Sequence, residues 1–144
     1  MKLVDIIDLW RVDSVIDKFK LTDESLNISQ LHSKYYEIYM NEKRVYVKEA
    51  ENFKNLEMHK TFWYGGKYLK PQLDELGWKQ FSITLAKSDI PIVVNADEDI
   101  INKKINMAEQ LEKVKFVESI LQSIHQRSFN IKNAIEYEKF LAGM

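Results

Sequence analysis

The chain has 144 residues, enough for one domain with a hydrophobic core and too few for two of ordinary size. It contains 45% hydrophobic and 30% charged residues, and its 21 basic and 22 acidic residues give a net charge of −1, which excludes strong attraction of the whole molecule to polyanions. Cysteine is absent, which excludes disulfide scaffolds, thiol catalysis and cysteine-based zinc sites.

The first residues predict a short amphipathic helix. Leu3, Ile6 and Trp10 lie at helical spacing, and Asp5 and Asp8 lie on the other side. We interpret this helix as a packing or swapping arm, because helices that lie on membranes carry Lys or Arg on their polar face. The two acids also break the apolar run, so we expect no signal peptide. No apolar run in the chain is long enough to predict a membrane span.

A long charged helix is expected over residues 22–63. Thr22 is a suitable N-cap, and Asp23 and Glu24 follow in the first turn, where the helix dipole favours acids. Apolar residues recur along this stretch, and neither glycine nor proline interrupts it. At about 1.5 Å per residue, such a helix spans roughly 60 Å, which is longer than a compact domain of this mass. It must therefore pair with another helix or project into a partner.

The middle of the chain predicts a change of structure. A glycine pair at residues 65–66 ends the long helix, and residues 71–76 predict a short helix with proline at its start and glycine after its end. Two short apolar runs follow, at residues 81–85 and 90–94. They are compatible with a small β-hairpin or with a packed irregular segment, because Pro91 limits strand pairing to an edge.

Helical periodicity returns in the last third. Asn95, with Glu98 three residues later, resembles a capping box, and apolar residues then recur as in a core or a coiled-coil seam. We expect a break at residues 127–130 and a final helix after it. These two helices carry more apolar positions than one small domain needs to cover, so we expect a ring-forming interface between copies. The residues assigned to this interface are Val114, Val117, Leu121, Ile124, Phe129, Ile131, Ile135 and Leu141.

No arrangement of residues supports catalysis. His32, His59 and His125 lie far apart and lack metal-binding spacing, while the acidic residues lie mainly beside lysines on helix faces. Residues 65–67 fail as a phosphate-binding loop, because Tyr68 stands where Ser or Thr should coordinate magnesium. We therefore expect a non-enzymatic protein without a metal site or a cofactor.

One segment, residues 60–70, combines lysines with aromatic residues. It holds three lysines and no acid, together with four aromatic residues and the glycine pair. Lysines neutralise phosphates and aromatic faces stack unpaired bases, so this composition favours single-stranded nucleic acid over duplex DNA. The competing interpretation is that the aromatic residues close the core where the helix ends, with the lysines solvated around them. The candidate DNA-binding residues are Lys60, Trp63, Tyr64, Lys67 and Lys70, with Lys54 as an extension.

Three stretches follow one another in a distinctive order. Val-Ile-Asp at residues 15–17 precedes the long charged helix with its Leu-His-Ser-Lys-Tyr-Tyr at 31–36, and the basic and aromatic residues 60–65 end that helix. Asn-Ala-Asp-Glu-Asp at 95–99 opens a C-terminal block that finishes with Phe-Leu-Ala-Gly at 140–143. In this order and in its length the chain resembles the UvsY family, the recombination mediators of large tailed bacteriophages.

The resemblance implies a role in phage recombination and repair. Such proteins bind single-stranded DNA that is coated by the phage single-stranded-DNA-binding protein, and they help to load a RecA-like recombinase of the UvsX type. The resemblance also implies a hexameric or heptameric ring that forms through the C-terminal helices, in the cytoplasm of the infected bacterium. Lys60 matches a basic DNA-contacting position of the family, and Met58 stands where a second one is expected.

The expected fold is mainly α, with a long helix, a C-terminal helical hairpin and a small irregular or β-hairpin segment between them, assembling as a ring-like homo-oligomer. We assign residues 1–95 to DNA binding and residues 96–144 to oligomerisation. The alternative is a helical structural or adaptor protein without affinity for nucleic acid. Residues 60–70 distinguish the two hypotheses, because a strut has no use for aromatic faces beside lysines.

Overall fold

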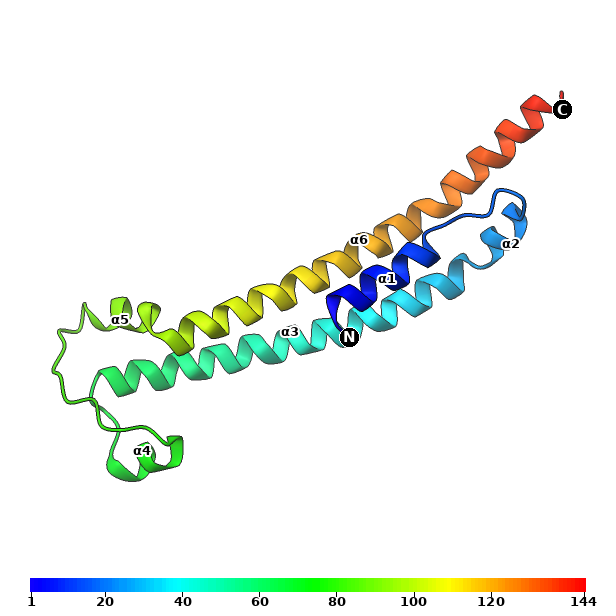
Figure 1. Cartoon of the computed structure of the whole chain (residues 1–144). Helices are drawn as coiled ribbons and strands as arrows, with labels where there is room; N and C mark the ends of the chain where they lie inside the picture. Colours follow the sequence, from blue (N-terminus) through cyan, green and yellow to red (C-terminus); the bar gives the residue numbers. More distant parts are fainter. The chain divides into compact units, whose positions relative to one another are not determined.

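The computed structural model describes residues 1–144 and contains six helices and no β-strand, which confirms the mainly α fold. The helices, labelled in Figure 1, are α1 (Leu3–Asp13), α2 (Leu21–Leu26), α3 (Ile28–Tyr64), α4 (Lys70–Leu76), α5 (Ile90–Ala96) and α6 (Glu98–Leu141). None of these helices has an apolar stretch that could span a bilayer.

The chain forms two compact units. The first, which we call the terminal unit, comprises Met1–Val45 and Gln110–Met144, and the second, the central unit, comprises Tyr46–Glu109. Helices α3 and α6 contribute to both units. The predicted division at residue 95, into a DNA-binding and an oligomerisation region, is a division by role, and it stays a prediction.

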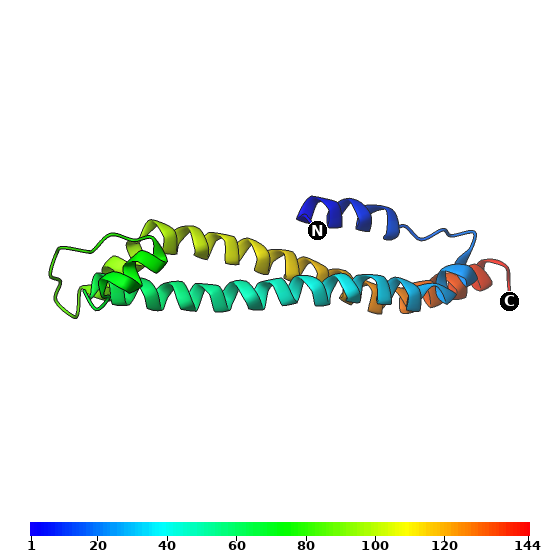
Figure 2. The same cartoon turned by 90° about the horizontal axis from the view of Figure 1, so that it is seen from below.

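The terminal unit has an apolar core in which three helices meet. Figures 1 and 2 show α1 beside α3 and α6. Ile6 of α1 and Tyr35 of α3 pack against Val117, Ile120 and Ile124 of α6, and all five side chains are buried. Fully burying one such aliphatic side chain stabilises the fold by roughly 1.5–3 kcal/mol. Helix α1 is therefore a packing arm within its own chain.

A buried carboxylate joins the N-terminus to this core. Glu42 accepts hydrogen bonds from the Gln110 side chain at 2.8 Å and from the amino group of Met1 at 3.1 Å, and it pairs with Lys113 at 3.3 Å. Burial alone would raise the pKa of Glu42, but these three donors together hold it below the ordinary value. The ionised carboxylate is thus fully partnered.

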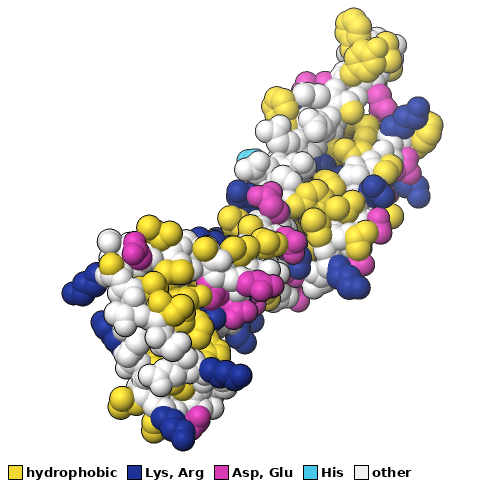
Figure 3. Space-filling view, turned by 60° about the vertical axis from the view of Figure 1, so that its left-hand side comes forward, with side chains coloured by type: hydrophobic (Ala, Val, Ile, Leu, Met, Phe, Trp, Pro, Cys, Tyr) yellow, Lys and Arg dark blue, Asp and Glu magenta, His cyan; other side chains and the backbone are white.

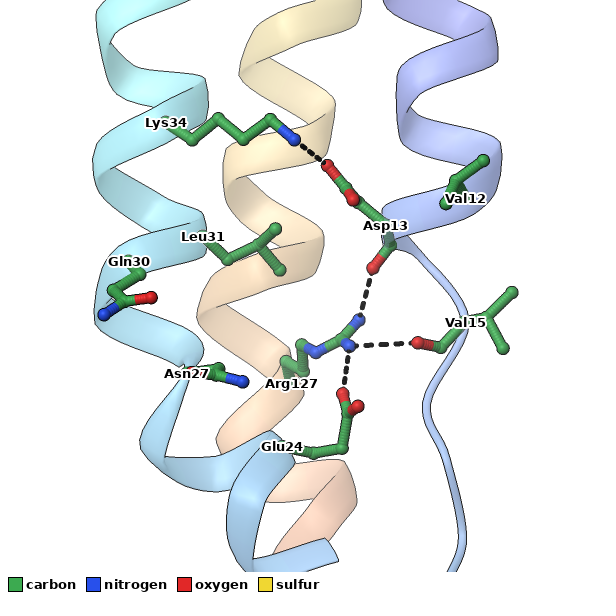
Figure 4. A pocket seen from close by; sticks show the side chains of 9 residues that line it. All are labelled: Val12, Asp13, Val15, Glu24, Asn27, Gln30, Leu31, Lys34 and Arg127. Atoms are coloured by element: carbon green, nitrogen blue, oxygen red, sulfur yellow. Dashed lines mark hydrogen bonds and ion pairs between the residues drawn. The ribbon is translucent and has the colours of Figure 1, made fainter. Parts of the chain in front are cut away.

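Arg127 holds the segment that follows α1. Its guanidinium donates to the backbone carbonyls of Asp13, Ser14 and Val15, each at 3.2 Å, and pairs with Glu24 at 2.6 Å. Figure 4 shows the contacts of Arg127 with Asp13, Val15 and Glu24, and beside them the ion pair of Lys34 with Asp13, whose length is 2.6 Å. Arg127 is almost fully buried, so its charge needs this complete set of acceptors.

Two expectations about the first long helix are wrong. The stretch 22–63 is not continuous, because Asn27 separates α2 from α3. Asparagine has a low helix propensity, since its side chain competes for the backbone hydrogen bonds. Thr22 is not the N-cap of α2, because the helix begins one residue earlier, at Leu21, with Lys20 at the cap.

Two expectations about the last third are also wrong. Helix α6 is capped by Asp97 rather than Asn95, because the Asp97 carboxylate accepts from the backbone N–H of Asp99 at 2.9 Å and of Ile100 at 3.2 Å. The break predicted at residues 127–130 does not form. Neither glycine nor proline interrupts the helix there, and Arg127 and Ile131 on either side are buried, so packing supports a continuous helix.

The central unit pairs the end of α3 with the beginning of α6 and adds two short helices. Lys103 of α6 forms an ion pair with Glu49 of α3 at 3.0 Å. Helix α4 confirms the short helix predicted after the glycine pair, and it ends at Gly77 in the left-handed conformation that favours glycine. Residues 90–94, one of the two candidate strands, lie in helix α5. Pro91 is compatible with this position, because the first turn of a helix needs no donor there.

Candidate nucleic-acid interface

Residues 60–70 form the end of α3, a tight turn and the beginning of α4, all within the central unit. Gly66 has a backbone φ of +67°, which residues other than glycine rarely adopt. The N–H of Gly66 donates to the carbonyl of Trp63 at 3.1 Å, and the N–H of Lys67 donates to that of Phe62 at 3.0 Å. This is the Schellman arrangement that satisfies the last carbonyls of a helix, so the glycine pair ends α3 as predicted.

Lys60 is buried, although the sequence around it suggests a free cation. Only 6% of the residue is exposed, and its ammonium pairs with Asp97 at 3.2 Å and with Asp99 at 2.9 Å. The same nitrogen lies 4.6 Å from the ring centroid of Trp78 and 5.1 Å from that of Trp63. Residues 60–70 contain no acid, but folding brings two acids to Lys60. A phosphate would reach it only by displacing them.

Trp63 and Tyr64 belong to an aromatic cluster beside this lysine. Their ring centroids lie 4.8 Å apart, and both rings contact Phe81, at 5.2 and 5.0 Å. The indole N–H of Trp63 donates to the carbonyl of Lys79 at 2.6 Å, and the hydroxyl of Tyr64 donates to Asp97 at 2.7 Å. The polar ends of both side chains are therefore used inside the unit, as in the core-closing interpretation.

The ionisation of this cluster follows from its contacts. Burial, and then the hydrogen bond to Asp97, raise the pKa of Tyr64 to about 12. Burial alone would also raise the pKa of Asp97. Hydrogen bonds from Tyr64, from the N–H of Ile100 and from Lys60 outweigh burial and hold the pKa of Asp97 below its ordinary value. Tyr64 is therefore neutral and Asp97 charged at neutral pH.

The other lysines of the segment are exposed. Lys67 and Lys70 form no ion pair, and the Lys67 ammonium lies 5.6 Å from the ring centroid of Phe62, which is itself partly exposed. Lys54 is exposed on α3 and forms only a surface pair with Glu51 at 3.4 Å. Figure 3 shows one face of the molecule, where hydrophobic side chains gather between separate Lys and Arg side chains.

Two pockets open beside these lysines. A third pocket, of about 480 Å³, lies around Arg127 in the terminal unit. The two pockets beside the lysines lie in the central unit: one of about 630 Å³ between the end of α3 and α4, and one of about 470 Å³ beside α4, and Tyr68 lines both. Lys67 lines the first of these and Lys70 the second.

Comparison with known proteins identifies the family. The family described as "Recombination, repair and ssDNA binding protein UvsY" matches residues 9–144. The chain belongs to the UvsY family. The resemblance seen in the sequence is thus confirmed, and it covers nearly the whole chain.

Solved structures agree with this assignment. In three crystal lattices of the bacteriophage T4 recombination mediator protein UvsY, the fold matches that of this chain. Lattice type II has 23% identity, covers 99% of this chain and 98% of that chain, and gives a TM-score of 0.84. Lattice type IV has 22% identity, covers 97% of this chain and 99% of that chain, and gives a TM-score of 0.84. Lattice type I has 21% identity, covers 94% of this chain and 98% of that chain, and gives a TM-score of 0.78. No curated protein matches the chain.

In this UvsY-family chain, the residues expected at the interface between copies fall into three groups. Half of them are covered by the chain's own terminal unit, two are half-buried, and two are largely exposed. The buried residues are Val114, Val117, Ile124 and Ile131, the half-buried ones are Leu121 and Ile135, and the exposed ones are Phe129 and Leu141. The interface stays a prediction, and only the exposed residues are available without rearrangement.

The sequence alone did not reveal the acidic partners of Lys60, nor that Trp78 and Lys79 belong to the same site. Asp97 and Asp99 lie far from Lys60 in the sequence and meet it only because α3 and α6 are antiparallel in the central unit. Trp78 and Lys79 lie in a stretch without helical or strand periodicity, so no pattern linked them to the segment. The one signal in the sequence is that Trp78 and Lys79 place an aromatic residue beside a lysine, as residues 60–70 do.

Proposed function

We propose that this chain is a single-stranded-DNA-binding recombination mediator that helps to load a RecA-like recombinase of the UvsX type onto DNA coated by single-stranded-DNA-binding protein. The observation that carries the proposal is the surface of the central unit where exposed Lys67 lies beside the partly exposed ring of Phe62, with exposed Lys70 at the start of α4. The family description names single-stranded DNA, and the related phage protein is titled a recombination mediator. Its place of action is the cytoplasm of the infected bacterium.

The phosphate contacts in this proposal come from the exposed lysines. Lys67 and Lys70 present their ammonium groups to solvent, and Lys54 extends the surface, because an exposed pair such as that with Glu51 stabilises little and exchanges readily for a phosphate. Lys60 and the rings beneath it support this surface by fixing the end of α3 against α6. The DNA-binding role is therefore divided between exposed contacts and a buried support.

Assembly into a ring-like homo-oligomer, a hexamer or heptamer, strengthens such a surface. The last turns of α6 expose the large hydrophobic side chains of Phe129, Tyr137, Phe140 and Leu141, which suit a head-to-tail interface that closes into a ring. One patch with a few lysines binds DNA weakly, but several copies on one strand bind it together. In this proposal residues 1–95 supply the DNA contacts and residues 96–144 the assembly contacts, without a catalytic step.

Binding of a labelled oligothymidylate, followed by fluorescence anisotropy across a range of salt concentrations, tests the proposal. Lys67→Ala with Lys70→Ala should weaken binding and reduce the salt dependence, since each lost phosphate contact on a single strand lowers the slope by about 0.7. Lys48→Ala is the matched control, because Lys48 is an exposed lysine of the same unit outside this surface. If the wild-type protein does not bind DNA, the adaptor hypothesis replaces this one.

A further inference from the structure

The two pockets of the central unit have one lining residue in common, Tyr68. Phe62 and Lys67 also line the first pocket, and Trp78 and Lys70 also line the second. Tyr68 is half-buried and its hydroxyl forms a hydrogen bond with the ring of His59, so the phenol is held in place. A fixed ring that lines two pockets can contact a flat group in each of them.

Both pockets combine the size and the lining that a nucleobase needs. Their volumes of about 630 and 470 Å³ lie within the usual range of small-molecule sites. The first has an apolar wall from Met58, Phe62 and Leu76, and the second offers the ring of Trp78. Aromatic faces of this kind stack unpaired bases without regard to sequence.

The charges favour a polyanion at the rims. Lys67 lines the first pocket, Lys70 and Lys79 line the second, and none of the three forms an ion pair within the chain. Each pocket also contains one carboxylate, Glu75 in the first and Asp74 in the second. A carboxylate repels phosphate but accepts hydrogen bonds from the N–H groups of bases, such as N3–H of thymine. We therefore place the phosphates at the lysines and the base edges inside the pockets.

We propose that these pockets hold two successive unpaired bases of a DNA strand, one in each pocket, with Tyr68 in contact with both. Lys67 contacts the phosphate at one rim, and Lys70 and Lys79 contact that at the other. The inference rests on the proposed function and adds to it the element that selects single strands. Paired bases cannot enter the pockets, because their faces are covered by their neighbours in the duplex.

The test compares oligonucleotides with and without bases. Two labelled strands of equal length are used, one of thymidines and one in which abasic sites replace part of them. Wild-type protein should bind the abasic strand more weakly. Tyr68→Ala should lower affinity for the thymidine strand at least about fivefold and shrink the difference between the two strands, while the salt slope stays unchanged. Tyr68→Phe keeps the ring and should retain most of the affinity.

The controls separate this inference from the proposed function. Ile83→Ala removes an exposed side chain of the same unit that lines neither pocket, and it should change nothing. Thermal melting shows whether each variant is folded, and Phe62→Ala repeats the test on the first pocket alone should Tyr68→Ala unfold. If the ring variants bind like wild type while Lys67→Ala with Lys70→Ala weakens binding, the base pockets are wrong and the DNA-binding function stands. If wild-type protein binds neither strand, both proposals fail.

Discussion

The two units differ in the contacts between α3 and α6, although the terminal unit also buries two charged residues, Glu42 and Arg127. In the terminal unit, α1 adds a third apolar surface, and Ile6 and Tyr35 bury themselves among aliphatic side chains of α6. In the central unit, a buried lysine lies between two carboxylates and two indole rings, and short helices and irregular chain complete the structure. An aliphatic core tolerates replacement by side chains of similar size, whereas a polar cluster needs every partner in place.

The comparison also separates stability from binding. In the terminal unit, the side chains of the core are buried against one another and offer no apolar surface to a ligand. The central unit instead leaves rings such as Phe62 partly exposed beside unpaired lysines. The substitutions below test whether the two units differ in this way, from the largest expected effect on stability to the smallest.

Shortening a core side chain of the terminal unit should have the largest effect. Ile120 is 1% exposed, and Ile120→Ala should lower the free energy of unfolding by about 2–5 kcal/mol, from lost burial and the cavity left behind. Urea denaturation measures this loss. Ile83→Ala, at an exposed position of the central unit, is the control and should change stability by less than about 0.5 kcal/mol. Equal effects of the two substitutions would contradict the buried core.

Removing the buried charge of the central unit should cost less. Lys60→Met keeps the length of the side chain but leaves Asp97 without its ammonium partner, and we expect a loss of about 1–3 kcal/mol. Lys54→Met, which breaks only a surface pair, should cost nearly nothing.

The same variant distinguishes support from DNA contact. Under conditions where Lys60→Met is folded, the salt dependence of DNA binding should equal that of wild type, because Lys60 is not exposed to phosphate in this fold. A reduced slope would show instead that Lys60 leaves its carboxylate partners when DNA binds.

Acid should act on both units through a few carboxylates that are partnered within the fold. The pKa values of Asp13 and Glu42 in the terminal unit and of Asp97 in the central unit are all lowered by the fold. A lowered pKa contributes stability that is present above the ordinary values, 3.8 for Asp and 4.5 for Glu, and is lost as the pH falls through the folded value. Denaturation by urea at decreasing pH should show this loss. Asp97→Asn should remove only the part of the pH dependence of the unfolding free energy that comes from the central unit.

Polar substitutions at the end of α6 should leave stability almost unchanged. Phe140 and Leu141 are largely exposed, so Phe140→Ser with Leu141→Ser should alter the free energy of unfolding by less than about 1 kcal/mol, or about 0.5 kcal/mol for each surface substitution. Sedimentation should nevertheless show a smaller assembly than wild type. A wild-type protein that sediments as a monomer at micromolar concentration would refute the ring.

Local signals predicted the helical fold and the ends of several helices. The glycine pair at residues 65–66 and the short helix with proline at its start are read from neighbouring residues, and both were correct. The break expected at residues 127–130 failed for a different reason. Arg127 looks like part of a surface turn in the sequence, but it is buried by residues more than 100 positions away.

The candidate site was also predictable only where local signals were sufficient. The composition of residues 60–70 indicated a basic and aromatic surface, and Lys67 and Lys70 are indeed exposed. The sequence could not show that Lys60 is buried, because its partners Asp97 and Asp99 come from another helix. Separating the exposed lysines from the buried one requires the tertiary structure.

The contacts of Arg127 bear on how this protein can change over evolution. Its guanidinium binds the backbone carbonyls of Asp13, Ser14 and Val15, and a carbonyl is the same in every residue type. The arginine therefore fixes the path of the chain after α1 while leaving the side chains of Ser14 and Val15 free to vary. Relatives can acquire new surface chemistry on this segment without losing the anchor that holds it.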